Sequence, residues 1–213
     1  MQQLANRTST VQSPVCDGAG NPAIAWAPVS RAAKRAFDVV AATVGLILSS
    51  PTFLLVSIAI KIDSRGPVFR PQMLHGYNNE NIPSLKFRTT MSSGTEDDTS
   101  FMTRVGAVLR RTGIDGLPQL INVLRGEMSI VGPSPYVVPP NNIFAERISL
   151  IQQRYRMRPG MTGWAQVNGC RGESNKVTRQ RIEFDLYYIE HWSFLLDIKV
   201  ILMSLFSKDS YLD

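Results

Sequence analysis

The stretch of sequence that decides the fold is TGIDGLPQLINVLRGEMSIVGPSP, residues 112–135. Pro118 suits the first turn of a helix, and the apolar residues around it recur at the spacing of one buried helical face. These apolar residues are Leu117, Leu120, Ile121 and Leu124. The predicted helix ends at Arg125 and Gly126, and residues 129–135 are typical of a short extended run closed by a double-proline turn. A helix with one buried face therefore anchors this region, and its start is left to face a site.

One carboxylate, Asp115, stands just before this predicted helix and shortly after the cationic pair Arg110 and Arg111. The helix dipole and the two arginines favour the anionic form of such an acid. Asp115 could then act as a nucleophile or a metal ligand at neutral pH. The alternative is that it only caps the helix, which is a common role of Asp at this position.

Composition limits the possible partners. The chain has 213 residues, and a hydrophobic content of 44% suits one domain with a core of ordinary size. The net charge of +6 indicates an acidic partner, either nucleic acid, anionic lipid or a phosphorylated substrate. A long apolar segment favours the last two over nucleic acid. Cys16 and Cys170 are far apart and there are only 2 histidines, so the sequence predicts neither a disulfide framework nor a zinc site.

The sequence predicts three regions. Residues 1–30 are polar and without periodicity, and we expect a disordered leader. Residues 31–62 contain an uncharged run from 39 to 60, long enough for the roughly 20 residues that a helix needs to cross a bilayer. Residues 63–213 would then form a cytoplasmic domain.

The membrane segment carries a break signal at its centre. Pro51 removes a backbone hydrogen bond, and the hydroxyl groups of Ser49 and Ser50 can satisfy the freed carbonyls. Basic residues flank the segment on both sides, which satisfies the positive-inside rule best when both ends lie on the cytoplasmic side. These basic residues are Arg31, Lys34, Arg35, Lys61 and Arg65. A kinked helix that crosses the bilayer remains the alternative.

Two further motifs suggest phosphate contacts. Lys86 and Arg88 fall on the same side of a predicted strand and could hold a diphosphate, or could simply lie on a solvated face. Residues 158–173 combine glycines with polar side chains, a composition that suits a nucleotide or sugar phosphate but also a glycine-rich turn.

The C-terminal region, residues 177–206, predicts one or two helices with aromatic residues beside an apolar run. The apolar run is too short to span a bilayer and is interrupted by Asp197 and Lys199. Aromatic residues next to an amphipathic helix suit the headgroup level of a membrane. The alternative is a helix whose aromatic residues lie in the protein core.

Four motifs occur here in one order: KFRTTM at 86–91, the stretch 112–135, RPGMTGWAQVNGCRGE at 158–173 and RIEFDLYYIEHWSFLLDIKVIL at 181–202. In these motifs the chain resembles the bacterial sugar transferase family, the monotopic polyprenyl-phosphate phosphoglycosyl transferases. The greatest resemblance is to the catalytic domains of undecaprenyl-phosphate glucose phosphotransferases. The resemblance implies a mainly α fold with a small β component (α+β). It also implies a re-entrant membrane helix broken at Ser50 and Pro51, together with interfacial amphipathic helices.

The resemblance also implies a reaction. The enzyme would transfer a hexose 1-phosphate from a UDP-sugar, with glucose expected first and galactose second, to undecaprenyl phosphate. This is the first membrane step in making exopolysaccharide or capsule repeat units. It would take place at the cytoplasmic face of the bacterial inner membrane, through a covalent phosphosugar on Asp115 and with Mg²⁺. A homo-oligomer remains possible.

The resemblance assigns roles to particular residues. Asp115 would be the nucleophile and a magnesium ligand. We expect Glu127, or alternatively Asp97, to supply the second carboxylate for the magnesium ion. The residues expected to bind substrate are Lys86, Arg88, Arg110, Arg111, Gln119, Arg158, Gln166, Asn168 and Arg171.

The chain departs from the family pattern at two site positions. Gly116 stands where the family has a second acid, and Ser134 stands where it has an arginine between two prolines. Two hypotheses follow. The chain is an active transferase, or it is a catalytically degenerate paralogue that regulates or helps to assemble the polysaccharide machinery.

Overall fold

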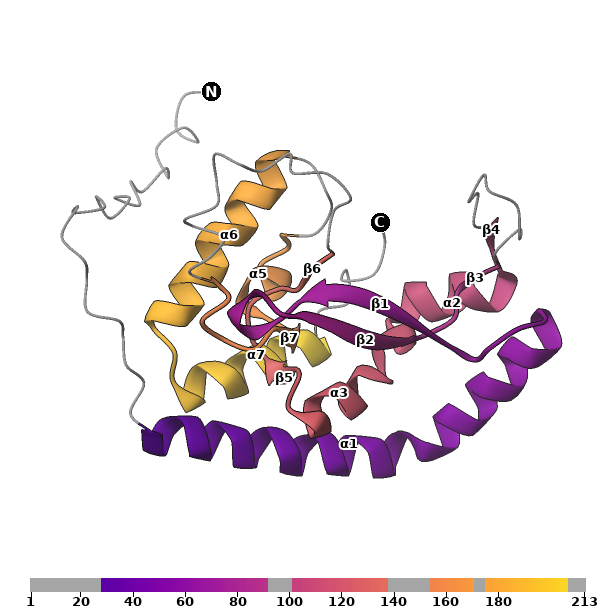
Figure 1. Cartoon of the computed structure of the whole chain (residues 1–213), viewed down its shortest axis with the longest axis horizontal. Coiled ribbons are helices and arrows are strands. Elements are labelled where there is room, and N and C mark those ends of the chain that lie inside the picture. The colour runs from indigo at the N-terminus through magenta and orange to yellow at the C-terminus, as the bar shows by residue number, and fades with distance from the viewer. Residues whose placement is uncertain (1–27, 92–100, 138–153, 171–174, 207–213) are drawn as a thin grey trace, which may run out of the picture.

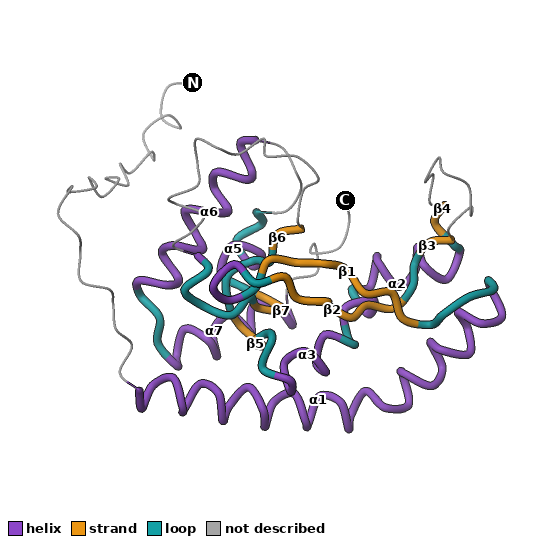
Figure 2. Tube along the Cα trace, viewed as in Figure 1, coloured by secondary structure: helices purple, strands orange, loops and turns teal. Residues whose placement is uncertain are grey.

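The computed structural model describes residues 28–91, 101–137, 154–170 and 175–206 (Figure 1). Most of the predicted leader, and Asp97 and Arg171 among the predicted site residues, lie outside these ranges. Helices dominate, and the strands form small sheets (Figure 2). The predicted mainly α fold with a small β component is therefore confirmed.

The predicted membrane segment forms one long helix, α1 (Pro28–Asp63), which lies along one side of the domain (Figure 1). Pro51 lies inside it, and the helix continues through the proline and bends. Pro51 cannot donate to the carbonyl of Ile47, and the Ser50 hydroxyl donates to that oxygen instead, at 2.8 Å. The Ser49 hydroxyl donates to the Gly45 carbonyl at 2.6 Å. The serines thus satisfy the carbonyls as predicted, whereas a break into two helices is not seen.

A long hairpin forms the main sheet. Strands β1 (Phe69–His75) and β2 (Asn81–Phe87) pair antiparallel along their whole length. The turn η1 (Tyr77–Asn79) joins them, and Asn78 adopts a left-handed conformation there with φ 53°. Strand β6 (Tyr136–Val137) pairs with the end of β1, so the strand order is β2-β1-β6. Among the residues that the structure describes, one edge of β2 therefore has no neighbouring strand.

Two small strand pairs and six further helical segments complete the described fold. β3 (Thr90–Met91) pairs antiparallel with β4 (Phe101–Met102), and β5 (Ser129–Val131) pairs parallel with β7 (Gly160–Thr162). The helical segments are α2 (Arg104–Thr112), η2 (Ile114–Gly116), α3 (Gln119–Arg125), α5 (Trp164–Val167), α6 (Asn175–Glu190) and α7 (Phe194–Phe206).

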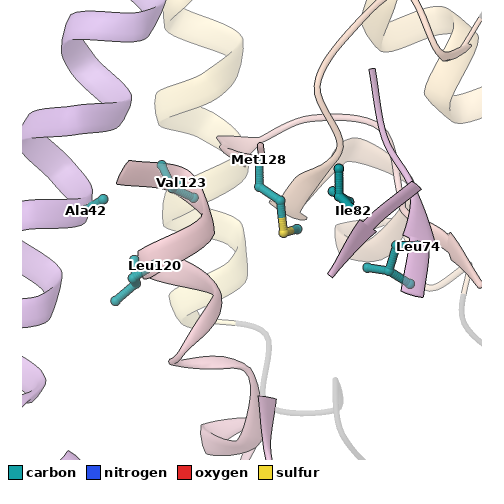
Figure 3. Close-up of a cluster of buried hydrophobic side chains, with 6 residues drawn as sticks. All are labelled: Ala42, Leu74, Ile82, Leu120, Val123 and Met128. Carbon is teal, nitrogen blue, oxygen red and sulfur yellow. The ribbon is translucent and has the colours of Figure 1, made fainter. Parts of the chain in front are cut away.

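Helix α3 is the predicted anchored helix. It begins after Pro118 and ends where Gly126 takes a left-handed conformation with φ 84°, as the sequence predicted. Leu120 and Val123 on α3 pack between Ala42 of α1 and the hairpin residue Ile82 (Figure 3). Leu74 and Met128 complete this cluster of buried side chains, and Leu117 and Leu124 pack against it. The apolar face of α3 thus joins α1 to the hairpin.

Polar contacts join the N-terminal half of α1 to the rest of the domain. The Lys34 ammonium group pairs with the buried Asp197 carboxylate of α7, with 2.7 Å between Nζ and Oδ2. The Tyr188 hydroxyl and the Trp192 indole N–H donate to the same carboxylate. One turn further along α1, buried Asp38 accepts hydrogen bonds from the Ser129 hydroxyl of β5.

Arg35 caps α3 from outside. Its guanidinium donates to the carbonyl oxygens of Val123 and Leu124, at 2.6 and 2.8 Å, in the last turn of α3. Cations near a helix C-terminus interact favourably with the unpaired carbonyls there. Lys34 and Arg35, which the sequence suggested as membrane-flanking charges, therefore bind within the domain.

We predict that Asp197→Asn destabilises the protein by about 3–5 kcal/mol, because the Lys34 charge stays buried without its counter-charge. The matched control is Glu183→Gln, which removes an exposed ion pair with Arg179 and should cost no more than about 1 kcal/mol. Chemical unfolding of each variant in the same detergent measures both effects. Equal destabilisation by the two substitutions would contradict the role assigned to this pair.

Candidate functional site

Asp115 lies in the η2 turn, between the end of α2 and the start of α3. Helix α3 begins later, with Pro118 at its N-cap position, so the Asp115 carboxylate does not cap α3. The alternative of a simple cap on that helix is therefore excluded. The carboxylate is partly buried in a site where α2, α3 and β2 meet.

Burial has the largest effect on the Asp115 carboxyl and raises its pKa above the ordinary value. Lys86 and then Arg110 oppose this effect, as do hydrogen bonds from the backbone N–H groups of Asp115 and Gly116. The expectation that nearby cations and the helix dipole alone would favour the anion was therefore wrong in sign, because it left out desolvation. A desolvated carboxylate between two cations is typical of functional sites.

The two cations come from different elements. Lys86 lies near the end of β2, and Arg110 lies in the last turn of α2. The Arg110 Nε atom donates to the Thr89 hydroxyl at 3.2 Å. This contact depends on Gly106, since a Cβ atom there would lie 2.0 Å from the Thr89 carbonyl oxygen. Helix α2 thus packs directly on the backbone that follows β2, which brings Arg110 to Asp115.

The Arg88 side chain, which was predicted to bind phosphate together with Lys86, packs inside the protein instead. Strand β2 ends at Phe87, and the Arg88 guanidinium is buried against the end of α1. It donates to the Ser64 carbonyl at 2.8 Å, to the Ser64 hydroxyl at 2.9 Å and to the Arg65 carbonyl. The predicted phosphate contact by Arg88 is therefore corrected to a structural role. Arg111 is exposed on α2 and is not among the groups that shift the pKa of Asp115.

Gln119 and Glu127 lie at opposite ends of α3: Gln119 is its first residue, and Glu127 follows its C-terminus. The Gln119 side chain is buried and donates to the Ser84 hydroxyl of β2 at 3.0 Å. Glu127 follows the C-terminus of α3 and accepts a hydrogen bond from Asn122, whereas Asp115 precedes the N-terminus. The seven-residue helix α3 that lies between them in the chain is about 10 Å long.

The described residues do not provide a built metal site. Across these residues, no three His, Cys, Asp or Glu side chains gather where a metal ion could bind. Asp115 precedes α3 and Glu127 follows it, and the prediction that they jointly hold magnesium stays a prediction. Asp115 is the single candidate ligand next to Lys86.

Two glycines of the 158–173 stretch, Gly160 and Gly163, pack against backbone. Cβ atoms at Gly160 and Gly163 would each lie 2.2 Å from backbone atoms of Gly132, so these glycines permit the close approach of β5 and β7. The turn-cluster alternative therefore holds for them. Among the predicted substrate contacts in this stretch, Arg158 is exposed and Asn168 donates to the Trp164 carbonyl. Their contacts with a substrate stay predictions.

Gln166 differs from its neighbours. Its Oε1 atom is buried and accepts no hydrogen bond from the part of the chain that the structure describes. Buried polar atoms in native proteins normally have a partner. Gln166 therefore remains the strongest of the predicted substrate contacts in this stretch.

Ser134 lies in a buried polar cluster that the sequence did not reveal. Its backbone N–H donates to Asp185 at 3.1 Å, and its carbonyl accepts from Arg154 at 2.7 Å. Arg154 and Asp185 form a buried ion pair, and burial outweighs Arg154 and raises the pKa of Asp185 to about 6. A cavity of about 10 Å³, lined in part by Ser134 and His75, leaves room for no more than a water-sized group. Arg154 thus places a guanidinium beside position 134.

An apolar stripe runs along the outer side of α1. Its exposed residues recur every three, four or seven positions, so they share one helical face. They are Val40, Val44, Ile47, Leu48, Leu54, Leu55, Ile58 and Ile62. By length and composition, α1 is the one helix among the described residues that could cross a membrane.

Helix α7 also exposes apolar residues. Leu195 and Phe206 have relative exposures of 76% and 81%, while Asp197 and Val200 on the opposite face are fully buried. Helix α6, in contrast, directs Tyr188 into the core. The core alternative thus holds for α6, and α7 has the surface that an interfacial helix requires.

Comparison with known proteins identifies the relatives of this chain. The family model described as bacterial sugar transferase matches residues 29–208. The UDP-glucose:undecaprenyl-phosphate glucose-1-phosphate transferase of Escherichia coli is 42% identical over 188 residues, which are 84% of this chain and 40% of that protein. The undecaprenyl-phosphate glucose phosphotransferase of Komagataeibacter xylinus is 42% identical over 197 residues, 84% of this chain and 37% of the relative.

A shorter relative matches along nearly its whole length. The exopolysaccharide production protein PSS of Rhizobium leguminosarum is 39% identical over 188 residues, which are 82% of this chain and 94% of the relative. The chain spans about two fifths of the two longer relatives. Since the family match covers all the elements that form the site around Asp115, the chain belongs to the bacterial sugar transferase family.

Proposed function

We propose that this chain transfers a hexose 1-phosphate, with UDP-glucose as the first donor and UDP-galactose as the second, to undecaprenyl phosphate. The observation that carries the proposal is Asp115, a partly buried carboxyl group whose pKa both Lys86 and Arg110 lower, in a member of this family. The names of the relatives support both the donor and the acceptor. The product would begin a repeat unit of exopolysaccharide or capsule.

The proposed reaction has two displacements. A carboxylate oxygen of Asp115 attacks the β-phosphorus of the donor, the bond from that phosphorus to the bridging oxygen breaks, and UMP leaves with the electron pair. An oxygen of undecaprenyl phosphate then attacks the phosphorus of the acyl phosphate and releases the carboxylate. Lys86 and Arg110 stabilise the negative oxygens around phosphorus in both steps. One nucleophile can thus serve a soluble donor and a membrane acceptor in turn.

Magnesium, which the resemblance implies, stays a prediction. When bound, such an ion neutralises phosphoryl oxygens and polarises the bond to phosphorus. The described side chains supply Asp115 as a single ligand, and the steps above do not depend on a metal ion.

The packing of α1 supports monotopic membrane association, with the protein at the cytoplasmic face of the bacterial inner membrane. Before Pro51, Ala42 packs on Leu120 of α3, and after Pro51, Ile60 packs on Phe87 of the hairpin. A helix that crossed the bilayer would have to give up one of these contacts. If both contacts are kept, the apolar stripe of α1 enters the hydrocarbon core of the membrane from one side. Helix α7 then lies at the membrane–water interface.

One observation favours a second candidate function, that of a regulator or assembly partner without catalytic activity. Position 116 carries no side chain, so the described part of the site has no second carboxylate beside Asp115. The predictions below separate the two functions.

The first test concerns the nucleophile. We expect Asp115→Asn to lower transfer of radiolabelled hexose phosphate from UDP-glucose to undecaprenyl phosphate by at least about three orders of magnitude, because an amide cannot form the acyl phosphate. Thermal unfolding and membrane attachment should be unchanged, since the partly buried side chain keeps its shape. Full transfer by this variant would rule out a covalent route through Asp115.

The second test concerns topology. We expect Arg31→Cys and Arg65→Cys, at exposed positions near the two ends of α1, to be shielded from a membrane-impermeant thiol reagent in whole cells. The background replaces Cys16 and Cys170, and lysed cells provide the control in which both sites react. Labelling of only one position in whole cells would show that α1 crosses the membrane.

The third test concerns position 116. Gly116 has no positive φ, and a Cβ atom there would lie 3.5 Å from its nearest neighbour, Gln119 Oε1, so Gly116→Glu should fold. An active enzyme shows turnover that Gly116→Glu raises or leaves unchanged. A regulator shows no turnover before this substitution.

Ser134→Arg serves as the contrasting variant at the other departure from the family pattern. It adds a long cation beside buried Arg154, where the cavity holds about 10 Å³, and should lower the melting temperature by several degrees. A Ser134→Arg variant as stable as the starting protein would contradict this description of the cluster.

A further inference from the structure

Asn122 occupies the uncovered edge of β2. Its side chain is fully buried on α3, within a run of apolar residues. Its Oδ1 atom accepts from the Leu85 backbone N–H at 2.9 Å, and its Nδ2 atom donates to the Pro83 carbonyl at 2.9 Å. One side-chain amide thus makes the two hydrogen bonds that a neighbouring strand would make.

The sequence of β2 fits this contact. Pro83 has no N–H, so the Leu85 N–H is the single backbone donor that the edge presents from 83 to 85. Asn122 accepts from this N–H and donates to the Pro83 carbonyl. Unpaired backbone groups at a buried edge would destabilise the fold. Met73 and Pro71 face Pro83 and Leu85 across the hairpin, so the contact fixes β1 as well.

The same face of the hairpin carries Lys86. Side chains two apart on a strand share a face, so Lys86 and Ser84 point the same way. Ser84 meets Gln119 of α3. Strand β2, which carries Lys86, packs on the η2 turn that contains Asp115, and the positive charge of Lys86 lowers the pKa of that carboxyl. Strand β2 and the segment from Asp115 to Asn122 therefore run side by side in opposite directions.

We propose that Asn122 is a positioning residue that fixes β2 on α3 and so keeps Lys86 near Asp115. This inference rests on the proposed function, which makes Lys86 and Asp115 important for the reaction. The contact itself does not depend on turnover. Asn122 touches neither substrate nor the reacting atoms in this account; it acts through Lys86.

A carbodiimide crosslink tests the placement directly. The reagent activates a carboxyl group, which an amine converts to an amide only when the amine can reach that carboxyl. We expect mass spectrometry of the full-length protein in nanodiscs to find a peptide joining Lys86 to Asp115, without any donor present. Its absence would overturn the inference, and Lys86→Met provides the blank.

The substitution Asn122→Ala should lower the yield of this crosslink by about tenfold or more, because small misplacements of reacting groups slow intramolecular reactions steeply. Val200→Ala is the matched control, since it makes a cavity at a fully buried position in another cluster. The control should keep the yield within about twofold of the starting protein, because its cavity leaves the 86–115 geometry alone. Equal yields in Asn122→Ala and the starting protein would overturn the inference.

Asn122→Asp decides the question if Asn122→Ala does not fold. The carboxylate keeps the acceptor for the Leu85 N–H but loses the donor to the Pro83 carbonyl and repels Glu127. The crosslink yield should fall here too, and an unchanged yield in the folded variant would overturn the inference. A protein that forms the crosslink but transfers no sugar phosphate would count against the proposed function only.

Kinetics give an independent readout in a protein that turns over. If Asn122 acts through Lys86, Asn122→Ala should reduce transfer much less in the Lys86→Met background than in the starting protein. A purely structural role predicts the same fold-loss in both backgrounds, and that result would overturn the inference.

Discussion

The packing of α3 between α1 and the β1–β2 hairpin is the contact on which the rest of the structure depends. Leu120 and Val123 meet Ala42 on one side, and the hairpin residues Leu74 and Ile82 complete the same cluster. Burial of such side chains contributes roughly 1.5–3 kcal/mol each, so this interface stabilises the domain and also fixes the start of α3. The start of α3 in turn fixes the position of Asp115, which lies in the turn just before it. Lys86 and Arg110 then come from the two elements that pack beside it.

The apolar helix α1 is part of this core. Its inner face contributes to two of the three buried clusters, and Lys34, Arg35 and Asp38 bind partners in α7, α3 and β5. Removing α1 would therefore expose the inner side of α3 and leave its last carbonyls without Arg35. The chain thus uses one helix both to complete its core and to present an apolar stripe outward. This joint use ties the position of the site to the surface that we propose enters the membrane.

Local signals in the sequence predicted the elements around the site well. Pro118 and Gly126 mark the ends of α3, and the Ser50 hydroxyl bonds the Ile47 carbonyl that Pro51 leaves free. The placement of Arg88 could not be predicted in this way, because the alternation of side chains holds only while the strand continues. Strand β2 ends at Phe87, and the Arg88 N–H then bonds to the Val68 carbonyl while its side chain turns to Ser64.

Polar pairs between residues far apart in the sequence could not be predicted from local sequence patterns. Arg154, which precedes the 158–173 stretch, pairs with Asp185 of the 181–202 stretch, and the sequence around either residue does not identify its partner. The same holds for Lys34 and Asp197. Asn122 is an intermediate case, since an amide within an apolar helical run is a signal that a buried polar partner exists, although not which one. The pKa of Asp115 was misjudged for a related reason: charge partners can be read from a sequence, but the depth of burial cannot.

The central claim is that Asp115 forms a covalent phosphosugar before the lipid acceptor takes part. It is tested most directly by isotope exchange between radiolabelled UMP and UDP-glucose, with the purified protein and without undecaprenyl phosphate. A covalent intermediate lets labelled UMP return to the phosphosugar, so labelled UDP-glucose should accumulate in the absence of any acceptor. Transfer to lipid without any such exchange would contradict the account, because it would require donor and acceptor to react directly.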